Sequence, residues 1–153
     1  MKKQHWIVIT LIALCTLIPR GLVAQSLDDA FNYSLSGVTA QKVRLTLIAQ
    51  NMANLTTLED ENTGLPWQKR YAVLTPGENG VRVVSVEKSN KPFGKYYDPA
   101  VPQSNADGYV AFPNVNIPDE MVNLAYTEMI FDSNITAFRT TKALYQNFVD
   151  AMK

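Results

Sequence analysis

Residues 121–152 read MVNLAYTEMIFDSNITAFRTTKALYQNFVDAM, and this stretch decides the fold of the chain. It contains no glycine and no proline, the residues that most often end a helix. Apolar side chains recur in it at alternating intervals of three and four, with interruptions at Glu128 and Lys142: Met121, Leu124, Phe131, Ile135, Phe138, Tyr145, Val149 and Met152. A series that continues over four heptads predicts a long helix that buries a narrow stripe against another helix.

A second, shorter stripe near the other end of the chain predicts the partner helix. Its members are Phe31, Leu35, Val38, Leu45, Ala49 and Met52. We expect this helix to run from about Leu27 to Asn54, with Ser26 as its N-cap and acidic residues in its first turn. Gly37 lies inside it, which indicates a close helix contact, a slight bend or a glycine that packing tolerates.

The chain begins with the pattern of a secretory signal peptide. Lys2 and Lys3 precede an uncharged stretch over 6–18, which is too short to span a bilayer of about 30 Å as a helix. Small Ala24 follows at a suitable cleavage position, so residues 1–24 are predicted to be removed. The alternative is an uncleaved amphiphilic anchor.

Cleavage would remove both Cys15 and His5, the only cysteine and the only histidine of the chain. The remaining chain, 25–153, could form no disulfide, thiolate nucleophile, Cys/His zinc site or histidine general base. Three of the 14 basic residues would also be lost, which leaves 11 against 14 acidic and a net charge of −3, so no basic patch predicts nucleic-acid binding. We expect no catalytic, metal or cofactor site, no small-molecule substrate, and a non-enzymatic protein.

The middle of the chain predicts one β-hairpin. We expect two strands, over 71–74 and 81–86, and Asn79-Gly80 between them is a strong turn signal. Residues 88–118 hold five of the eight prolines, so we expect little regular structure there. We expect the aromatic side chains of this region to anchor a long loop to the core: Phe93, Tyr96, Tyr97, Tyr109 and Phe112.

Together these features predict an α+β fold in which long N- and C-terminal helices pair as a coiled coil around a small middle region. The predicted organisation is a signal peptide over 1–24, an N-terminal helical region over 25–57, a β-hairpin and Pro/aromatic-rich loop region over 58–116, and a C-terminal helix over 117–153. Pro118 and the two acidic residues after it mark the start of the last helix. Such a chain is suited to assembly rather than to catalysis.

Three ordered blocks of sequence resemble the flagellar basal-body rod protein family, in particular its small proximal-rod subunits. The first block runs from Ser36-Gly37-Val38 to Asn51-Met52-Ala53-Asn54, and the second from Tyr97-Asp98-Pro99 to Pro113-Asn114-Val115. The third begins at Glu120-Met121-Val122 and includes Tyr126, Asn134, Phe138, Thr141 and Lys142. Together the blocks cover essentially all of residues 30–153.

The resemblance implies a structural subunit of the proximal rod, the drive shaft of the flagellar motor in the periplasm. It also implies self-assembly through the terminal helices, with other rod subunits and itself as partners. The hook–basal-body adaptor and MS-ring components are further candidate partners. Subunits of this family usually leave the cell through the flagellar type III export channel without a cleaved signal, so residues 1–24 depart from the family pattern.

The resemblance also suggests residues for the assembly interface. The helical seams supply Leu35, Val38, Leu45, Ala49, Met52, Leu124, Phe131, Ile135, Phe138, Tyr145 and Val149. Asn51 and Asn54 are expected to cap or cross-link the end of the first helix, or simply to end it. The alternative function is a secreted periplasmic adaptor or binding module that kept the rod-protein fold without polymerising.

Overall fold

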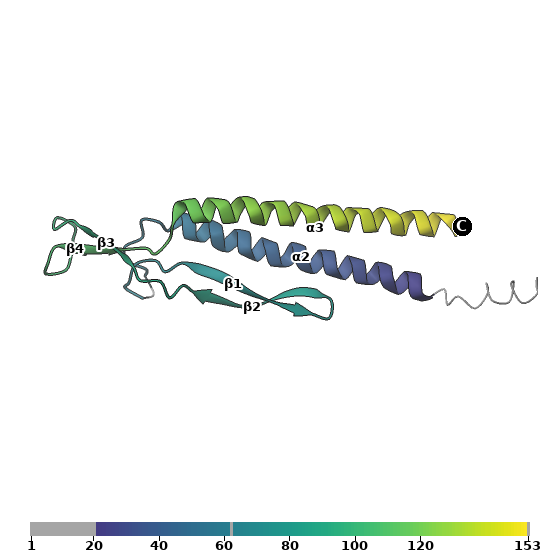
Figure 1. Cartoon of the computed structure of the whole chain (residues 1–153), viewed down its shortest axis with the longest axis horizontal. Helices are drawn as coiled ribbons and strands as arrows, with labels where there is room; N and C mark the ends of the chain where they lie inside the picture. Colours follow the sequence, from purple (N-terminus) through teal and green to yellow (C-terminus); the bar gives the residue numbers. More distant parts are fainter. Residues whose placement is uncertain (1–20, 62, 153) are drawn as a thin grey trace, which may run out of the picture.

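The computed structural model describes residues 21–61 and 63–152, and the chain forms an elongated molecule (Figure 1). Its elements follow in the order α2 (Gly21–Ala53), β1 (Arg70–Gly77), β2 (Gly80–Lys88), β3 (Gly94–Tyr97), β4 (Tyr109–Phe112) and α3 (Ile117–Ala151). Two long terminal helices pack together and small antiparallel hairpins lie between them in sequence, which confirms the predicted α+β class. The predicted signal peptide lies mostly outside the described residues.

Helix α2 begins at Gly21, well before the predicted start at Leu27. Ser26 therefore lies inside the helix, and its prediction as the N-cap was wrong. The residues between Gly21 and Ser26 include no proline, so the helical backbone continues through them without a break. In the other direction the helix ends at Ala53, close to the predicted Asn54.

Helix α3 begins where the proline and the acidic residues predict. Asn116 is its N-cap, and its side-chain Oδ1 accepts a hydrogen bond from the backbone N–H of Asp119 at 3.0 Å. Pro118 falls in the first turn, where no intrahelical donor is lost, and Asp119 and Glu120 face the positive end of the helix dipole. The first turn thus defines the position from which the whole helix extends.

The two helices run antiparallel, and three contacts fix their register. Asn51 donates a hydrogen bond to Glu120, Gly37 lies against Asn134, and the Phe31 ring packs edge-on against Phe138 with 5.4 Å between ring centroids. The first two contacts are separated by two heptads on both helices, so one register holds over that length. The N-terminal end of α2 therefore lies beside the C-terminal end of α3 (Figure 1).

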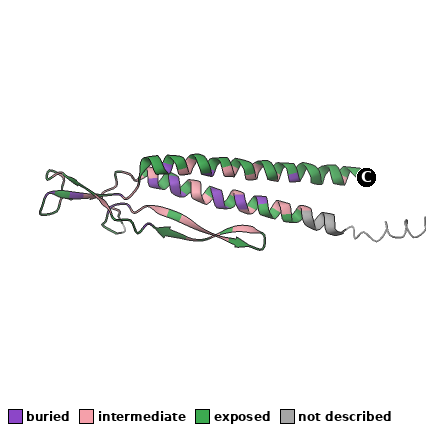
Figure 2. Cartoon of the chain, viewed as in Figure 1, coloured by how far each residue is buried: buried purple, intermediate pink, exposed green. Residues whose placement is uncertain are grey.

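Strands β1 and β2 form the predicted hairpin along α2. They pair antiparallel from Arg70 with Lys88 to Gly77 with Gly80, with an irregularity at Val73. The hairpin tip is attached to α2, because the backbone N–H of Val81 donates to Ser36 Oγ at 3.1 Å. Helix α2 is thus covered by α3 and by the hairpin, and Figure 2 shows buried positions concentrated on it while α3 is largely exposed.

Strands β3 and β4 form a second small hairpin, beyond the ends of the helices (Figure 1). The prediction of little regular structure in this region missed it. The prolines of the region lie in the flanking segments and the connecting loop, outside both strands, so the four-residue ladders keep their backbone donors.

The aromatic side chains of this second hairpin were predicted to anchor it to the core, and that prediction was wrong. Tyr97 and Tyr109 meet edge-on at 5.5 Å but are 65% and 46% exposed. Tyr96 and Phe112 pack at 5.8 Å and also remain exposed. These rings contact one another across the two strands, and the buried side chain of the hairpin is Val110.

Asn114 ties the second hairpin to the first. Its Oδ1 accepts from the backbone N–H of Lys69 at 2.7 Å, and its Nδ2 donates to the carbonyl oxygen of Lys91 at 2.7 Å. Asn114, which follows β4, thus connects its own segment to the segment before β1 and to the segment after β2. It holds the chain in position just before α3 begins.

Candidate assembly interface

The inner face of α3 combines an apolar row with a polar one. The apolar row repeats every seven residues and was predicted: Leu124, Phe131, Phe138 and Tyr145. Beside it runs a polar row, also spaced by seven, that apolar periodicity did not reveal: Glu120, Thr127, Asn134 and Thr141. Glu120, Thr127 and Thr141 are the buried residues of the described helix, so the deepest row of α3 is polar.

The second apolar row predicted for α3 lies on its flank instead. Met121 is 58% exposed, Ile135 and Val149 are half-buried, and Tyr145 at the end of the first row is 49% exposed. The apolar periodicity located the correct side of the helix. The buried row begins at Glu120, however, one residue before Met121, where the second apolar row was predicted to begin.

The stripe predicted for α2 also lies beside its most buried surface. Phe31, Val38, Leu45 and Met52 are half-buried, whereas Leu35 is 53% exposed and Ala49 is exposed. The buried positions of the described helix are Ser34, Gly37, Ala40, Gln41, Leu47, Ile48 and Asn51. Since α2 is covered on two sides, its buried surface is wider than the stripe of a simple helix pair.

Asn51 is the centre of a buried polar cluster at the end of the helix pair. Its Oδ1 accepts from the backbone N–H of Arg70 at 2.9 Å and from Trp67 Nε1 at 3.3 Å. Its Nδ2 donates to the carbonyl oxygen of Arg70 at 2.8 Å and to Glu120 Oε2 at 3.3 Å. Asn51 therefore cross-links α2, β1 and α3, one of the roles expected for it.

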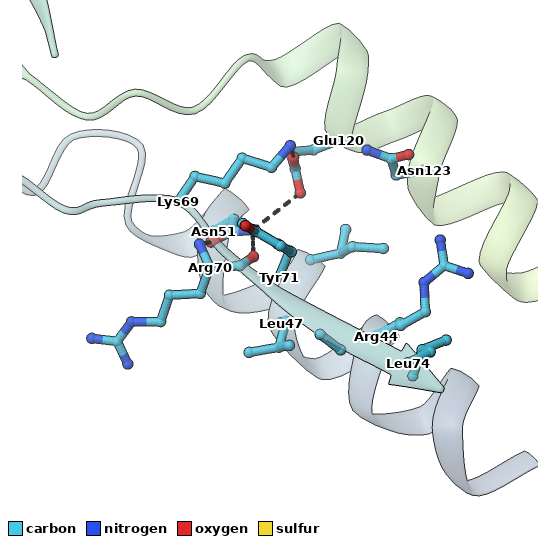
Figure 3. Close-up of a pocket in the computed structure, with 11 residues that line it drawn as sticks. Arg44, Leu47, Asn51, Lys69, Arg70, Tyr71, Leu74, Glu120 and Asn123 are labelled. Atoms are coloured by element: carbon cyan, nitrogen blue, oxygen red, sulfur yellow. Dashed lines mark hydrogen bonds and ion pairs between the residues drawn. The ribbon is translucent and has the colours of Figure 1, made fainter. Parts of the chain in front are cut away.

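Glu120 is almost fully buried, and its charge is compensated. Its Oε1 forms an ion pair with Lys69 Nζ, and its Oε2 accepts the hydrogen bond from Asn51 (Figure 3). The Arg70 guanidinium points away from Glu120 and lies 4.2 Å from the centroid of the Trp67 ring. A carboxylate buried with a cation and an amide is tolerated, and loss of either partner would leave it poorly satisfied.

The cluster borders a groove of about 400 Å³ between α2, β1 and α3. Leu47, Ile48 and Leu74 supply its apolar lining, and Arg44 and Lys69 supply cations. Tyr71 on its edge donates a hydrogen bond to Glu87 at 3.2 Å, and this bond raises the pKa of the Tyr71 hydroxyl. The part of the chain that the structure describes contains no group of three His, Cys, Asp or Glu side chains that could hold a metal ion.

Asn54 has a local role, unlike Asn51. Its Nδ2 donates to the carbonyl oxygen of Gln50 at 2.8 Å, and its Oδ1 accepts from the Thr57 hydroxyl at 3.0 Å. These bonds satisfy polar groups where α2 ends and make no link to another element. The two asparagines of the predicted pair thus divide the expected roles, one cross-linking and the other capping.

The outer face of α3 carries a second apolar series, which the sequence reading did not use. Val122, Tyr126 and Met129 are between 54% and 70% exposed, and they lie on the side of the helix turned away from the inner rows. Leu144 and Phe148 are also exposed, but they lie on the inner side near the end of α3, where Phe148 follows Thr141 by seven residues. The spacing of Val122, Tyr126 and Met129 by four and three residues was a visible signal, but the stronger inner series masked it. Among residues 21–61 and 63–152, neither helix is long and apolar enough to cross a membrane.

Known proteins with similar sequences identify the family, although no protein-family model matches the chain. The chain is 30% identical over 144 residues to the flagellar basal-body rod protein FlgC of Borreliella burgdorferi, covering 79% of this chain and 94% of that protein. It is 30% identical over 145 residues to FlgC of Bacillus subtilis, covering 81% and 97%. For FlgC of Salmonella typhimurium the identity is 33% over 125 residues, covering 78% and 92%.

The chain belongs to the FlgC family of flagellar basal-body rod proteins. Membership of the FlgC family confirms the resemblance on which the sequence analysis relied. It also confirms a structural rather than enzymatic protein, located in the basal-body rod that spans the periplasm. The α2–α3 pair and its exposed faces are therefore the candidate interface of a rod protein.

Proposed function

We propose that this FlgC-family chain is a subunit of the proximal rod that self-assembles through its paired terminal helices. The observation that carries the proposal is the outer apolar face of α3, formed by Val122, Tyr126 and Met129. A helix that is apolar on two faces can bury one in its own fold and the other against a neighbour. The proposed partners are other copies of this chain and other rod subunits.

The size of this face suits a contact between subunits. Its three large side chains are more than half exposed, and burying their exposed surface would contribute roughly 3–5 kcal/mol. Association itself costs on the order of 4–15 kcal/mol, so this face would need help from other contacts. Of the predicted interface residues, Leu35, Ala49 and Tyr145 remain exposed enough to provide it.

The remaining predicted interface residues are proposed to act indirectly. Val38, Leu45, Met52, Leu124, Phe131, Ile135, Phe138 and Val149 are half-buried within the single chain. Through this packing they would hold α2 and α3 in the straight pair that presents the outer face. A contact between unlike surfaces of successive copies extends into a helical polymer when its rotation does not close, which is the geometry of a rod.

The test is complementation of a strain that lacks this gene, with Met129→Glu as the main variant. We expect the purified variant to keep its helix content and melting temperature, while motility and its recovery in basal bodies are lost. Gln146→Glu is the matched control, because it adds the same charge at an exposed site of α3 outside the apolar face. It should swim normally.

A variant of the inner face separates assembly from folding. Phe138→Asp should also prevent incorporation, but with a clear fall in melting temperature, because Phe138 packs against Phe31. If Met129→Glu assembles and swims like the control, the outer face is not the interface. Absence of the unaltered protein from well-purified basal bodies, with the protein free in the periplasm, would favour the adaptor function.

A further inference from the structure

The groove between α2, β1 and α3 combines an apolar lining with a cation that has no ion-pair partner (Figure 3). Its large aliphatic side chains are Leu47, Ile48 and Leu74. Arg44 lies half-buried at one end, where its Nη1 donates a hydrogen bond to Gln41 Oε1 at 3.1 Å. Within the described residues Arg44 forms no ion pair, whereas Lys69 pairs with Glu120. A half-buried guanidinium beside apolar side chains favours a carboxylate from outside the chain.

The outer apolar face of α3 has the complementary character. Asp132 follows Met129 by three residues, so it lies at the edge of the face that Val122, Tyr126 and Met129 form. Asp132 is exposed and forms no ion pair within the described residues. The face therefore places an unpaired carboxylate beside apolar side chains, as the groove places an unpaired guanidinium beside them.

The face and the groove lie at the same level along the molecule. The register that pairs Asn51 with Glu120 and Gly37 with Asn134 places Arg44 beside residue 127. The α2 residues of the groove, 44–51, therefore lie beside residues 120–127 of α3, and the face occupies 122–129 of that helix. Because the face is turned away from α2, a single copy cannot cover its groove with its own face.

We propose that this groove binds the outer face of α3 from a second copy of the chain, with Asp132 of that copy paired with Arg44. The inference rests on the proposed use of the outer face and names its partner surface. In a rod built from one repeated contact, all copies have the same direction along the axis. Two such copies side by side need little axial shift to bring the face of one to the groove of the next, because both surfaces lie at one level.

The contact joins unlike surfaces, so each copy retains a face for one neighbour and a groove for another. Such a contact continues from copy to copy instead of ending at a dimer. The Arg–Asp pair would fix the position of the contact, since complementary charges set the register of an interface more than they add affinity. The aliphatic lining of the groove supplies the additional burial that the outer face needs to overcome the cost of association.

The first test reverses the charges of the proposed ion pair and measures recovery of the protein in purified basal bodies. Arg44→Glu and Asp132→Arg alone should each lower recovery by about tenfold, because each brings like charges together at the contact. Combined in one chain they should restore recovery to within about threefold of the unaltered protein, since every contact then contains the reversed pair. Helix content and melting temperature of each purified variant show whether its fold is kept.

Each reversal has a matched control in the same helix. Lys42→Glu makes the same change as Arg44→Glu at an exposed site of α2 that does not line the groove. Glu128→Arg matches Asp132→Arg at an exposed site of α3 outside the face. Neither control should lower recovery, and Lys42→Glu should not restore the recovery of Asp132→Arg.

A second measurement does not depend on how Arg44→Glu folds. Two differently tagged copies are expressed together in a Cys15→Ser background, one with Leu74→Cys in the groove and the other with Met129→Cys in the face. Oxidation of their basal bodies should join the two tags through a disulfide. Lys42→Cys is the control for Leu74→Cys, because residue 42 lies at the level of residue 129 but outside the groove, and it should give no mixed disulfide.

The outcomes distinguish this inference from the proposed function. If Met129→Glu is excluded from basal bodies but the double reversal recovers no better than the single ones and no mixed disulfide forms, the outer face binds a different rod subunit and the inference is wrong. Normal recovery of both single reversals would also overturn it. If Arg44→Glu does not fold, the mixed disulfide alone decides. If Met129→Glu swims like its control, the proposed use of the outer face fails, and this inference fails with it.

Discussion

At the scale of single residues, Asn51 has the largest structural role that the described contacts assign. Its replacement by alanine would leave the Trp67 indole N–H and both backbone groups of Arg70 without their partner, and would leave Glu120 with Lys69 alone. Each buried polar group left unsatisfied costs about 1–3 kcal/mol. We therefore expect Asn51→Ala to lower the free energy of unfolding by about 3 kcal/mol or more, measured by urea denaturation.

Asn54→Ala is the matched control for that experiment. It removes the same side chain three residues later, but there the lost bonds are local and partly exposed, so we expect a cost of about 1 kcal/mol. Equal effects of the two substitutions would mean that Asn51 does not join the three elements as its contacts indicate.

At the scale of elements, the position of the β1–β2 hairpin on α2 depends on Gly80. This glycine has a φ of 111°, and a Cβ atom at this position would lie 2.1 Å from Ser36 Oγ. Gly80→Ala combines backbone strain with a clash at the hairpin tip, so we expect a loss of about 1–3 kcal/mol. Hydrogen exchange should show that β1 and β2 lose protection before the centres of α2 and α3 do.

Gly77→Ala provides the comparison, at the other end of the same turn. There φ is not positive, and the nearest atom to a new Cβ is 3.6 Å away, an ordinary van der Waals contact. We expect its effect on the free energy of unfolding to stay within about 0.5 kcal/mol. If the two alanine variants lose stability equally, contact between the hairpin tip and Ser36 does not hold this element in place.

Most of these elements could be predicted from the sequence, because their signals are local. Pro118 with its acidic neighbours located the start of α3, and Asn79-Gly80 located the hairpin turn. The second hairpin could not be found in this way, since prolines around it conceal two strands of four residues each. The local signal at the start of α2 was misleading, because Ser26 is a residue type that favours the N-cap position but lies within a continuous helix.

The candidate interface was predictable only in part, because apolar periodicity detects apolar side chains and overlooks buried polar ones. It found the side of α3 that includes Phe138 but overlooked Thr127 and Asn134, which are polar and lie deeper in the contact. Their seven-residue spacing becomes meaningful once α2 is placed opposite. Likewise cross-linking was one of the alternatives given for Asn51, but Glu120, 69 residues away, could not be named as its partner.

At the scale of the whole molecule, the antiparallel register determines what removal of the predicted signal peptide, 1–24, would do. The same register that pairs Gly37 with Asn134 and Asn51 with Glu120 places residue 25 opposite residue 146. Cleavage after Ala24 would therefore leave the last turn of α3, up to Ala151, without a facing α2. A helical turn without a packed neighbour frays at low cost.

We propose that residues 1–24 are a secretory signal, and mass spectrometry of purified basal bodies tests this directly. We expect a mature N-terminus at or near Gln25, and fast hydrogen exchange of α3 amides beyond residue 146 in the protein purified from the periplasm. A chain that begins at Gln25 should complement as well as the full chain if it is given another secretory signal. Basal bodies that contain the peptide of residues 1–24 would instead show an uncleaved segment, and α2 would then extend beside α3 to its end.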